Sequence, residues 1–269
     1  EWLARGVDSW FGNRPFEDGG AVRNGRFDLR LLLREHKSPD LGARFNASFR
    51  LPNFEQRTTR FFLGRDNPRE VVTDQPGALT REQRLRRDAA RNDAFFAGLG
   101  LDGGGGFDFR VGLRGGPKPY AQVRYRHEWQ LGPADTLDFL ETVFWTRSDR
   151  IGSTTALSYE HDFSPTLVGR WLNATTITQR KARFDWSSNL GLYRSFGNQR
   201  LLSSEVLLRG REGGGVHIEE YGLQLSWEQP LHEDWLLGEI SVGHFRERES
   251  ADEARRGMWA VGLNLKIRF

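Results

Sequence analysis

The last eleven residues of the chain read Trp-Ala-Val-Gly-Leu-Asn-Leu-Lys-Ile-Arg-Phe (259–269). Large apolar side chains occupy every odd position of this stretch, and small or polar side chains occupy every even one. Because successive side chains of a β-strand point to opposite faces, this period of two predicts a strand with one apolar and one polar face. The same alternation recurs at 27–34, 41–51, 107–114 and 121–129. The sequence therefore predicts an all-β chain.

A soluble β-sandwich also alternates, so other features must separate it from a transmembrane barrel. The alternating stretches run to about ten residues or more, whereas strands of soluble proteins average about five or six. Trp, Tyr and Phe gather near the ends of the apolar faces, as in the aromatic girdles of membrane barrels. The polar faces carry Arg, Glu and Gly rather than Thr, Ser and Lys. All three features favour the transmembrane barrel.

Counting the alternating stretches gives the expected architecture, a transmembrane antiparallel up-and-down β-barrel of 14 strands. The strands at 58–65 and 93–102 flank the longest connection, and a barrel of 12 strands is the alternative without them. Turn-forming residues such as Ser38-Pro39-Asp40 and Gly213-Gly214-Gly215 separate the stretches. The expected strands are 26–36, 41–52, 58–65, 93–102, 107–115, 120–130, 136–147, 151–162, 167–179, 183–195, 199–210, 216–228, 235–248 and 258–269.

Composition removes several classes of function. The formal net charge is only +3, too balanced for a nucleic-acid-binding protein, although the pI is about 9.4. The chain has no cysteine, which excludes disulfides, zinc–thiolate sites and thiol catalysis. Nearly all cations are Arg, which favours paired contacts.

The C-terminal strand resembles those of Gram-negative outer-membrane β-barrels. It ends on Phe269, and an alternating last strand with a terminal Phe is similar to the signal read by the barrel-assembly machinery. This resemblance implies a porin-like protein in the bacterial outer membrane, in contact with outer-membrane lipid and lipopolysaccharide and with that machinery. Phe61–Asn67 and Gly115–Tyr120 also resemble segments of an uncharacterised proteobacterial outer-membrane family, a resemblance that implies no function.

Two segments stand apart from the barrel, which we expect over 23–269. Residues 1–22 include apolar side chains on one amphipathic face, typical of a periplasmic, interfacial or plug segment, or of a stub left by processing. The long extracellular loop at 66–92 contains Thr80-Arg81-Glu82-Gln83, a capping box that predicts a short charged helix. This helix either constricts the pore or lies in solvent outside it.

The polar parity of the strands defines the expected lumen. Cations come from the early strands and carboxylates from the later ones, which would set a field across the pore. We expect the following residues to line it: Arg30, Arg34, Arg44, Arg50, Arg60, Arg110, Arg114, Arg124, Arg126, Glu128, Glu160, Glu205, Glu220, Glu228 and Glu239. The strand at 136–147 is ambiguous, because Asp138 and Glu141 have opposite parity.

This lining predicts an outer-membrane channel for passive diffusion of small polar or anionic solutes. A structural or partner-binding barrel with a closed, ion-paired lumen is the alternative, and a lipid hydrolase or lipid transporter is a further one. Ser158 with His161, and Ser226 or Ser241 with His244, are the Ser–His combinations within strands, and none has a specific signature. The sequence predicts no enzyme, no cofactor, no metal site and no nucleic-acid partner, and leaves the oligomeric state open.

Overall fold

A computed structural model describes residues 21–35, 37–50, 59–65, 95–147, 149–180, 184–212, 217–233, 235–248 and 254–268. Fourteen strands run through these residues, and they are the following: β1 (Ala21–Arg34), β2 (Asp40–Arg50), β3 (Thr59–Arg65), β4 (Phe95–Gly104), β5 (Phe107–Arg114), β6 (Pro119–Gln130), β7 (Asp135–Thr146), β8 (Arg150–Ser164), β9 (Leu167–Thr178), β10 (Phe184–Ser195), β11 (Leu201–Arg211), β12 (Ile218–His232), β13 (Leu236–Glu247) and β14 (Arg256–Arg268).

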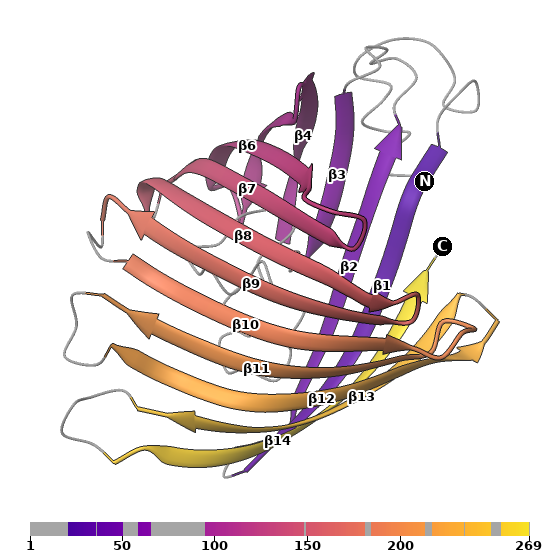
Figure 1. The fold of residues 1–269 in the computed structure, drawn as a ribbon. Helices are drawn as coiled ribbons and strands as arrows, with labels where there is room; N and C mark the ends of the chain where they lie inside the picture. Colours follow the sequence, from indigo (N-terminus) through magenta and orange to yellow (C-terminus); the bar gives the residue numbers. More distant parts are fainter. Residues whose placement is uncertain are drawn as a thin grey trace.

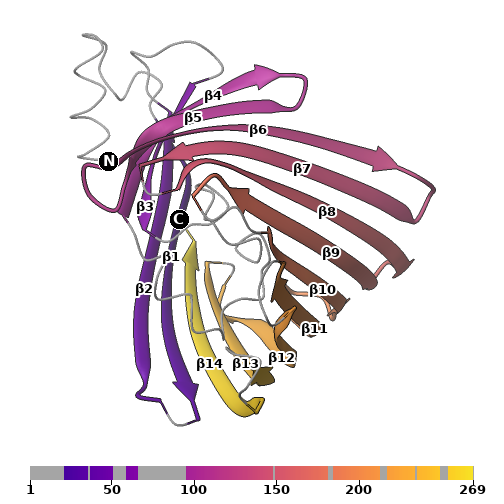
Figure 2. The same ribbon diagram turned by 90° about the vertical axis from the view of Figure 1, so that its left-hand side faces the viewer.

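The strands form one closed antiparallel barrel. Each strand pairs with its neighbours in sequence, and β1 closes the sheet by pairing with β14 over Arg26–Arg34. Figures 1 and 2 show the sheet curving round until its first strand, β1, lies beside its last, β14. The up-and-down antiparallel fold and the fourteen strands agree with the sequence-based expectation. Among the described residues, no helix is long and apolar enough to cross a membrane.

The ends of a few strands differ from the expected ones. Strand β1 begins at Ala21, inside the segment expected to precede the barrel. Strand β12 continues to His232, through residues that the sequence assigns to a turn. Its pairing with β13 shifts between Pro230 and His232. Proline has no N–H to donate and is tolerated in strands at such irregularities, which explains why the extension of the expected strand 216–228 through Pro230 was not predicted.

The outer and inner faces of the wall have opposite chemistry. Large apolar side chains cover the outside, and Trp259 and Leu190, for example, each expose 57% of their surface. The expectation that Arg, Glu and Gly rather than Thr and Ser form the polar face is wrong for β8 and β9, where threonine hydroxyls line the inside: Thr154 and Thr176 are buried and hydrogen-bonded to each other at 2.8 Å. An apolar surface this extensive suits lipid, and a polar interior suits water, as in transmembrane barrels.

Several bulky apolar residues also point inward, although most residues of the inner face are small or polar. The ring of Phe144 lies over Gly152 on β8, and the ring of Phe245 lies over Gly222 on β12. In each case a Cβ on the glycine would fall 2.4 Å from the ring. Glycines on one strand therefore make room for aromatic rings on the next, an arrangement that fixes strand register.

Candidate pore lining

The strand register decides which side chains face the lumen. Directly opposed residues of antiparallel strands lie on the same face, so the buried residues identify the inner set. Asp108 opposes Arg124, and Arg114 opposes the buried Phe96. Arg34 opposes the buried Ala260 on β14. The shifts in pairing lie near strand ends, so parity holds along the strand middles.

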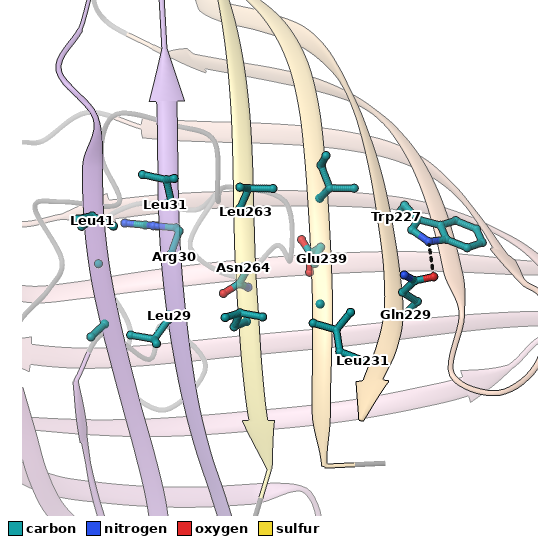
Figure 3. Close-up of a pocket in the computed structure, with 15 residues that line it drawn as sticks. Leu29, Arg30, Leu31, Leu41, Trp227, Gln229, Leu231, Glu239, Leu263 and Asn264 are labelled. Atoms are coloured by element: carbon teal, nitrogen blue, oxygen red, sulfur yellow. Dashed lines mark hydrogen bonds between the residues drawn. The ribbon is translucent and has the colours of Figure 1, made fainter. Parts of the chain in front are cut away.

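Arginines on the inner face gather on β1, β2, β5 and β6. We call this group the arginine arc, and it consists of Arg30, Arg34, Arg44, Arg110, Arg114 and Arg124. Arg30 and Arg124 are only 6% and 9% exposed. The Arg30 side chain extends along the wall towards β2 (Figure 3), where Gly42 has no side chain to obstruct its guanidinium. Side chains from several strands thus place guanidinium groups on one side of the lumen.

Carboxylates accompany some of these arginines. Asp108 accepts a hydrogen bond from Arg110 Nε at 2.5 Å, and Asp40 lies 3.9 Å from Arg30. Arg126 makes a two-pronged contact with Asp138, at 2.9 Å from Nε and 2.7 Å from Nη2. Arg126 and Glu128 are both more than half exposed at the end of β6. Arg126 is therefore fixed at the barrel mouth, whereas Arg124 lies deeper in the wall.

Apart from Glu128 on β6, the carboxylates expected to line the pore come from strands β8 to β13, and the last of them, Glu239, lies only two strands from Arg30. Together with Asp185 on β10 we call this group the carboxylate arc, and it consists of Glu160, Asp185, Glu205, Glu220, Glu228 and Glu239. Tyr193 donates a hydrogen bond to Glu205 at 2.6 Å. Arg170 lies 3.3 Å from Glu160, and Arg211 Nε lies 2.6 Å from Asp185. The carboxylate arc is thus interrupted by arginines, and the two arcs are less sharply separated than the early and late strands suggest.

Lys266, near the end of β14, is a buried residue of the inner face that the sequence-based set omits. Its ammonium forms ion pairs with both Glu228 and Glu239, and the Lys266 side chain is 3% exposed. Ser241 donates a hydrogen bond to Glu239 at 3.2 Å, and Ser226 donates one to Ser241 at 2.9 Å. The even parity of the last strand is the signal that locates Lys266 on the inner face.

Some expected site residues lie outside the described part of the chain or are described by backbone alone. Arg50 and Arg60 belong to β2 and β3, but their side chains are outside the described set. Phe269, the expected assembly signal, is also outside it, as are the loop at 66–92 and residues 1–20. The ambiguity within 136–147 is resolved, because Asp138 faces inward and Glu141 outward.

The serine–histidine combinations weighed for hydrolysis are split between the two faces. Ser226 faces inward, and His244 faces outward beside the ring of Trp259. Ser158 likewise faces inward, whereas His161 faces outward and contacts Asp135 at 2.7 Å. Within the described ranges, no cluster of three or more His, Asp or Glu side chains is arranged to hold a metal ion.

An apolar groove of about 750 Å³ lies on the outer face, over β2, β1, β14, β13 and β12. Leu29, Leu31 and Leu263 line it, together with Trp227, whose indole N–H donates to Gln229 at 3.3 Å (Figure 3). These side chains have outward parity, whereas Arg30, Glu239 and Asn264, which also border the groove, have inward parity. The groove therefore lies mainly on the lipid-facing surface, and residues of the inner face contribute to its border.

Solved structures resemble this fold although their sequences do not. No family model and no curated protein sequence matches the chain. OmpT, an outer membrane protein of Vibrio cholerae, aligns with a TM-score of 0.54 and 10% identity, covering 94% of this chain and 98% of OmpT. The anion-selective porin from Comamonas acidovorans aligns with a TM-score of 0.51 and 10% identity, covering 93% of this chain and 100% of the porin. The chain has the channel-like fold of bacterial outer-membrane β-barrels, and its apolar outer face fits that location.

Proposed function

We propose that this protein is a passive outer-membrane channel for small polar or anionic solutes, in a Gram-negative bacterium. The observation that carries the proposal is the arginine arc, in which guanidinium groups of four strands face the lumen. Clustered positive charge lowers the free energy of an anion in a narrow polar passage and disfavours apolar solutes. Outer-membrane lipid, lipopolysaccharide and the barrel-assembly machinery are its expected partners.

A passive channel requires no catalytic group, and we propose that the protein is not an enzyme. The division of Ser226 and His244 between the two faces of the wall supports this, because a general base must reach the nucleophile that it activates. A hydrolase would show turnover of ester substrates that depends on one serine. Absence of lipase and esterase activity in folded, membrane-inserted protein is the expected result.

Single-channel recording in planar bilayers tests the channel directly. We expect steady conductance and, in a salt gradient, a reversal potential that indicates preference for anions. Arg124→Ala should lower the anion-to-cation permeability ratio several-fold, because Arg124 is buried in the inner wall. Arg194→Ala is the matched control, since Arg194 lies on the outer face over the ring of Phe196 and its loss removes the same charge outside the lumen.

A closed structural barrel is the second candidate, and a specific observation favours it. Ion pairs such as those of Lys266 with Glu228 and Glu239 stiffen the wall, and Phe245 and Leu32 pack together inside it. Such contacts fill small barrels and prevent conduction. Silence at all voltages and salt concentrations, from protein with a verified barrel fold, would overturn the channel and support the closed barrel.

A further inference from the structure

A carboxylate lies on the lipid-facing side of the barrel wall. Glu141 occurs in the middle of β7, where its neighbours across the sheet are Tyr125 on β6 and Thr155 on β8. Val143 and Trp145, which share its face, are exposed apolar residues of the outer surface. An ionisable side chain facing hydrocarbon is costly, and residues of this kind usually mark a functional contact.

Polar side chains continue from Glu141 across the next three strands. We call them the outer polar stripe, and it consists of Glu141 on β7, Ser153 and Thr155 on β8, Asn173 and Thr175 on β9, and Ser188 on β10. The register confirms that they are neighbours, since Thr155 opposes Thr175 and Asn173 opposes Ser188. The outer face of β12–β14 is different, because Leu225, Val242 and Leu263 dominate it.

Contacts within the chain satisfy only part of the hydrogen-bonding capacity of the stripe. Thr155 donates a hydrogen bond to Glu141 at 2.6 Å, and Ser153 donates one to the other carboxylate oxygen. Ser188 accepts one from the Trp171 indole at 3.0 Å. No side-chain hydrogen bond to another described residue is seen for Asn173 or Thr175. A carboxylate accepts about four hydrogen bonds and an amide offers two donors, so Glu141 on β7 and Asn173 on β9 retain hydrogen-bonding capacity.

We propose that the outer polar stripe is an interface with a second copy of this chain. A second copy fits because the stripe is self-complementary, with an acceptor-only carboxylate on β7 and amide and hydroxyl donors on β9 and β10. In a two-fold contact of like faces, the β7 side of one copy meets the β10 side of the other. Each carboxylate then approaches donors rather than the other carboxylate. Lipid tails offer no such partner.

Cysteine cross-linking in the membrane tests this contact, since the chain contains no cysteine that would compete. Asn173→Cys places a thiol near the centre of the stripe, and Val242→Cys places one on the far outer wall, where Val242 is exposed. Under mild oxidation we expect disulfide-linked dimers for Asn173→Cys and at least ten-fold fewer for Val242→Cys. Equal cross-linking of the two variants, or none in either, would overturn the proposal.

Variants of Glu141 separate an interface from a lipid-facing carboxyl group. In the Asn173→Cys background, Glu141→Leu should lower the dimer fraction several-fold, whereas Glu141→Gln should retain most of it because the amide oxygen still accepts hydrogen bonds. Native mass spectrometry of the cysteine-free protein in lipid nanodiscs gives an independent measurement. A monomer there, or a dimer that Glu141→Leu leaves intact, would contradict the interface.

Discussion

Lys266 shows how one inner residue holds several strands together. It extends from β14 between Glu239 on β13 and Glu228 on β12, and its side chain is almost fully buried. Replacing it with methionine would leave two adjacent carboxylates without their shared cation. We expect Lys266→Met to lower the free energy of unfolding by about 3 kcal/mol, as for other buried pairs that lose one partner. Urea unfolding of the refolded barrel in detergent measures this change.

A double-mutant cycle checks that the loss comes from the ion pair. Lys266→Met combined with Glu239→Gln removes a carboxylate as well as the cation, and it should recover part of the stability lost in the single variant. Additive losses in the double variant would mean that Lys266 acts through packing alone.

Asp138 controls the charge available at the barrel mouth. Its carboxylate holds the Arg126 guanidinium through two hydrogen bonds. Asp138→Asn should release that charge and raise the anion-to-cation permeability ratio measured from reversal potentials. Asp135→Asn is the control, because Asp135 lies on the same strand but faces outward, where it accepts hydrogen bonds from Tyr159 and His161. An equal effect of both substitutions would contradict a lumenal role for Asp138.

At the level of the strands, glycine–aromatic pairs set how closely neighbours approach. A side chain at Gly152 would collide with the ring of Phe144, which is 3% exposed. We expect Gly152→Val to lower the free energy of unfolding by about 2 kcal/mol, the usual cost of overpacking. Adding Phe144→Leu should restore part of the loss, and failure to do so would show that the glycine is needed for another reason. Denaturant titration of the three variants provides the comparison.

Strand positions were predictable because alternation is a local signal. The expected stretches at 107–115, 120–130 and 167–179 differ from β5, β6 and β9 by one residue at an end. Strand ends were harder to predict. Hydrogen bonding with a neighbouring strand, rather than the side-chain pattern, extends β1 to Ala21 and β8 to Ser164. The length of that pairing depends on the register of the two strands, which alternation within one strand does not reveal.

The faces of side chains were predictable, but their partners were not. Parity alone assigns Arg124 and Glu239 to one face of their strands. It does not reveal that Arg126 is held by Asp138, or that Lys266 joins Glu228 to Glu239. Those contacts depend on which strands are adjacent and on their relative stagger, and Glu228 and Lys266 meet because β12, β13 and β14 pair in succession.

For the whole molecule, the fixed positive charge of the arginine arc predicts selectivity that depends on salt. The field of fixed charges extends about 10 Å at 0.1 M salt and about 3 Å at 1 M. We expect the anion-to-cation permeability ratio to approach one as the salt concentration rises through this range. Arg124→Ala should reduce the ratio at low salt and change it little at high salt. A ratio independent of salt would mean that solutes are selected by direct contact instead.

The junction of β1 and β14 has a consequence for how the barrel is completed. Leu29 opposes Leu265 on the outside, and Asp28 opposes Lys266 on the inside. If the register between β1 and β14 shifted by one residue, Leu29 would lie opposite Lys266. One of the two strands would then have to turn its charged side to lipid or its apolar side to water. Closure in the wrong register is therefore penalised along the whole seam. The two-faced pattern acts as a proofreading device during assembly, rejecting misaligned ends before the cylinder is sealed.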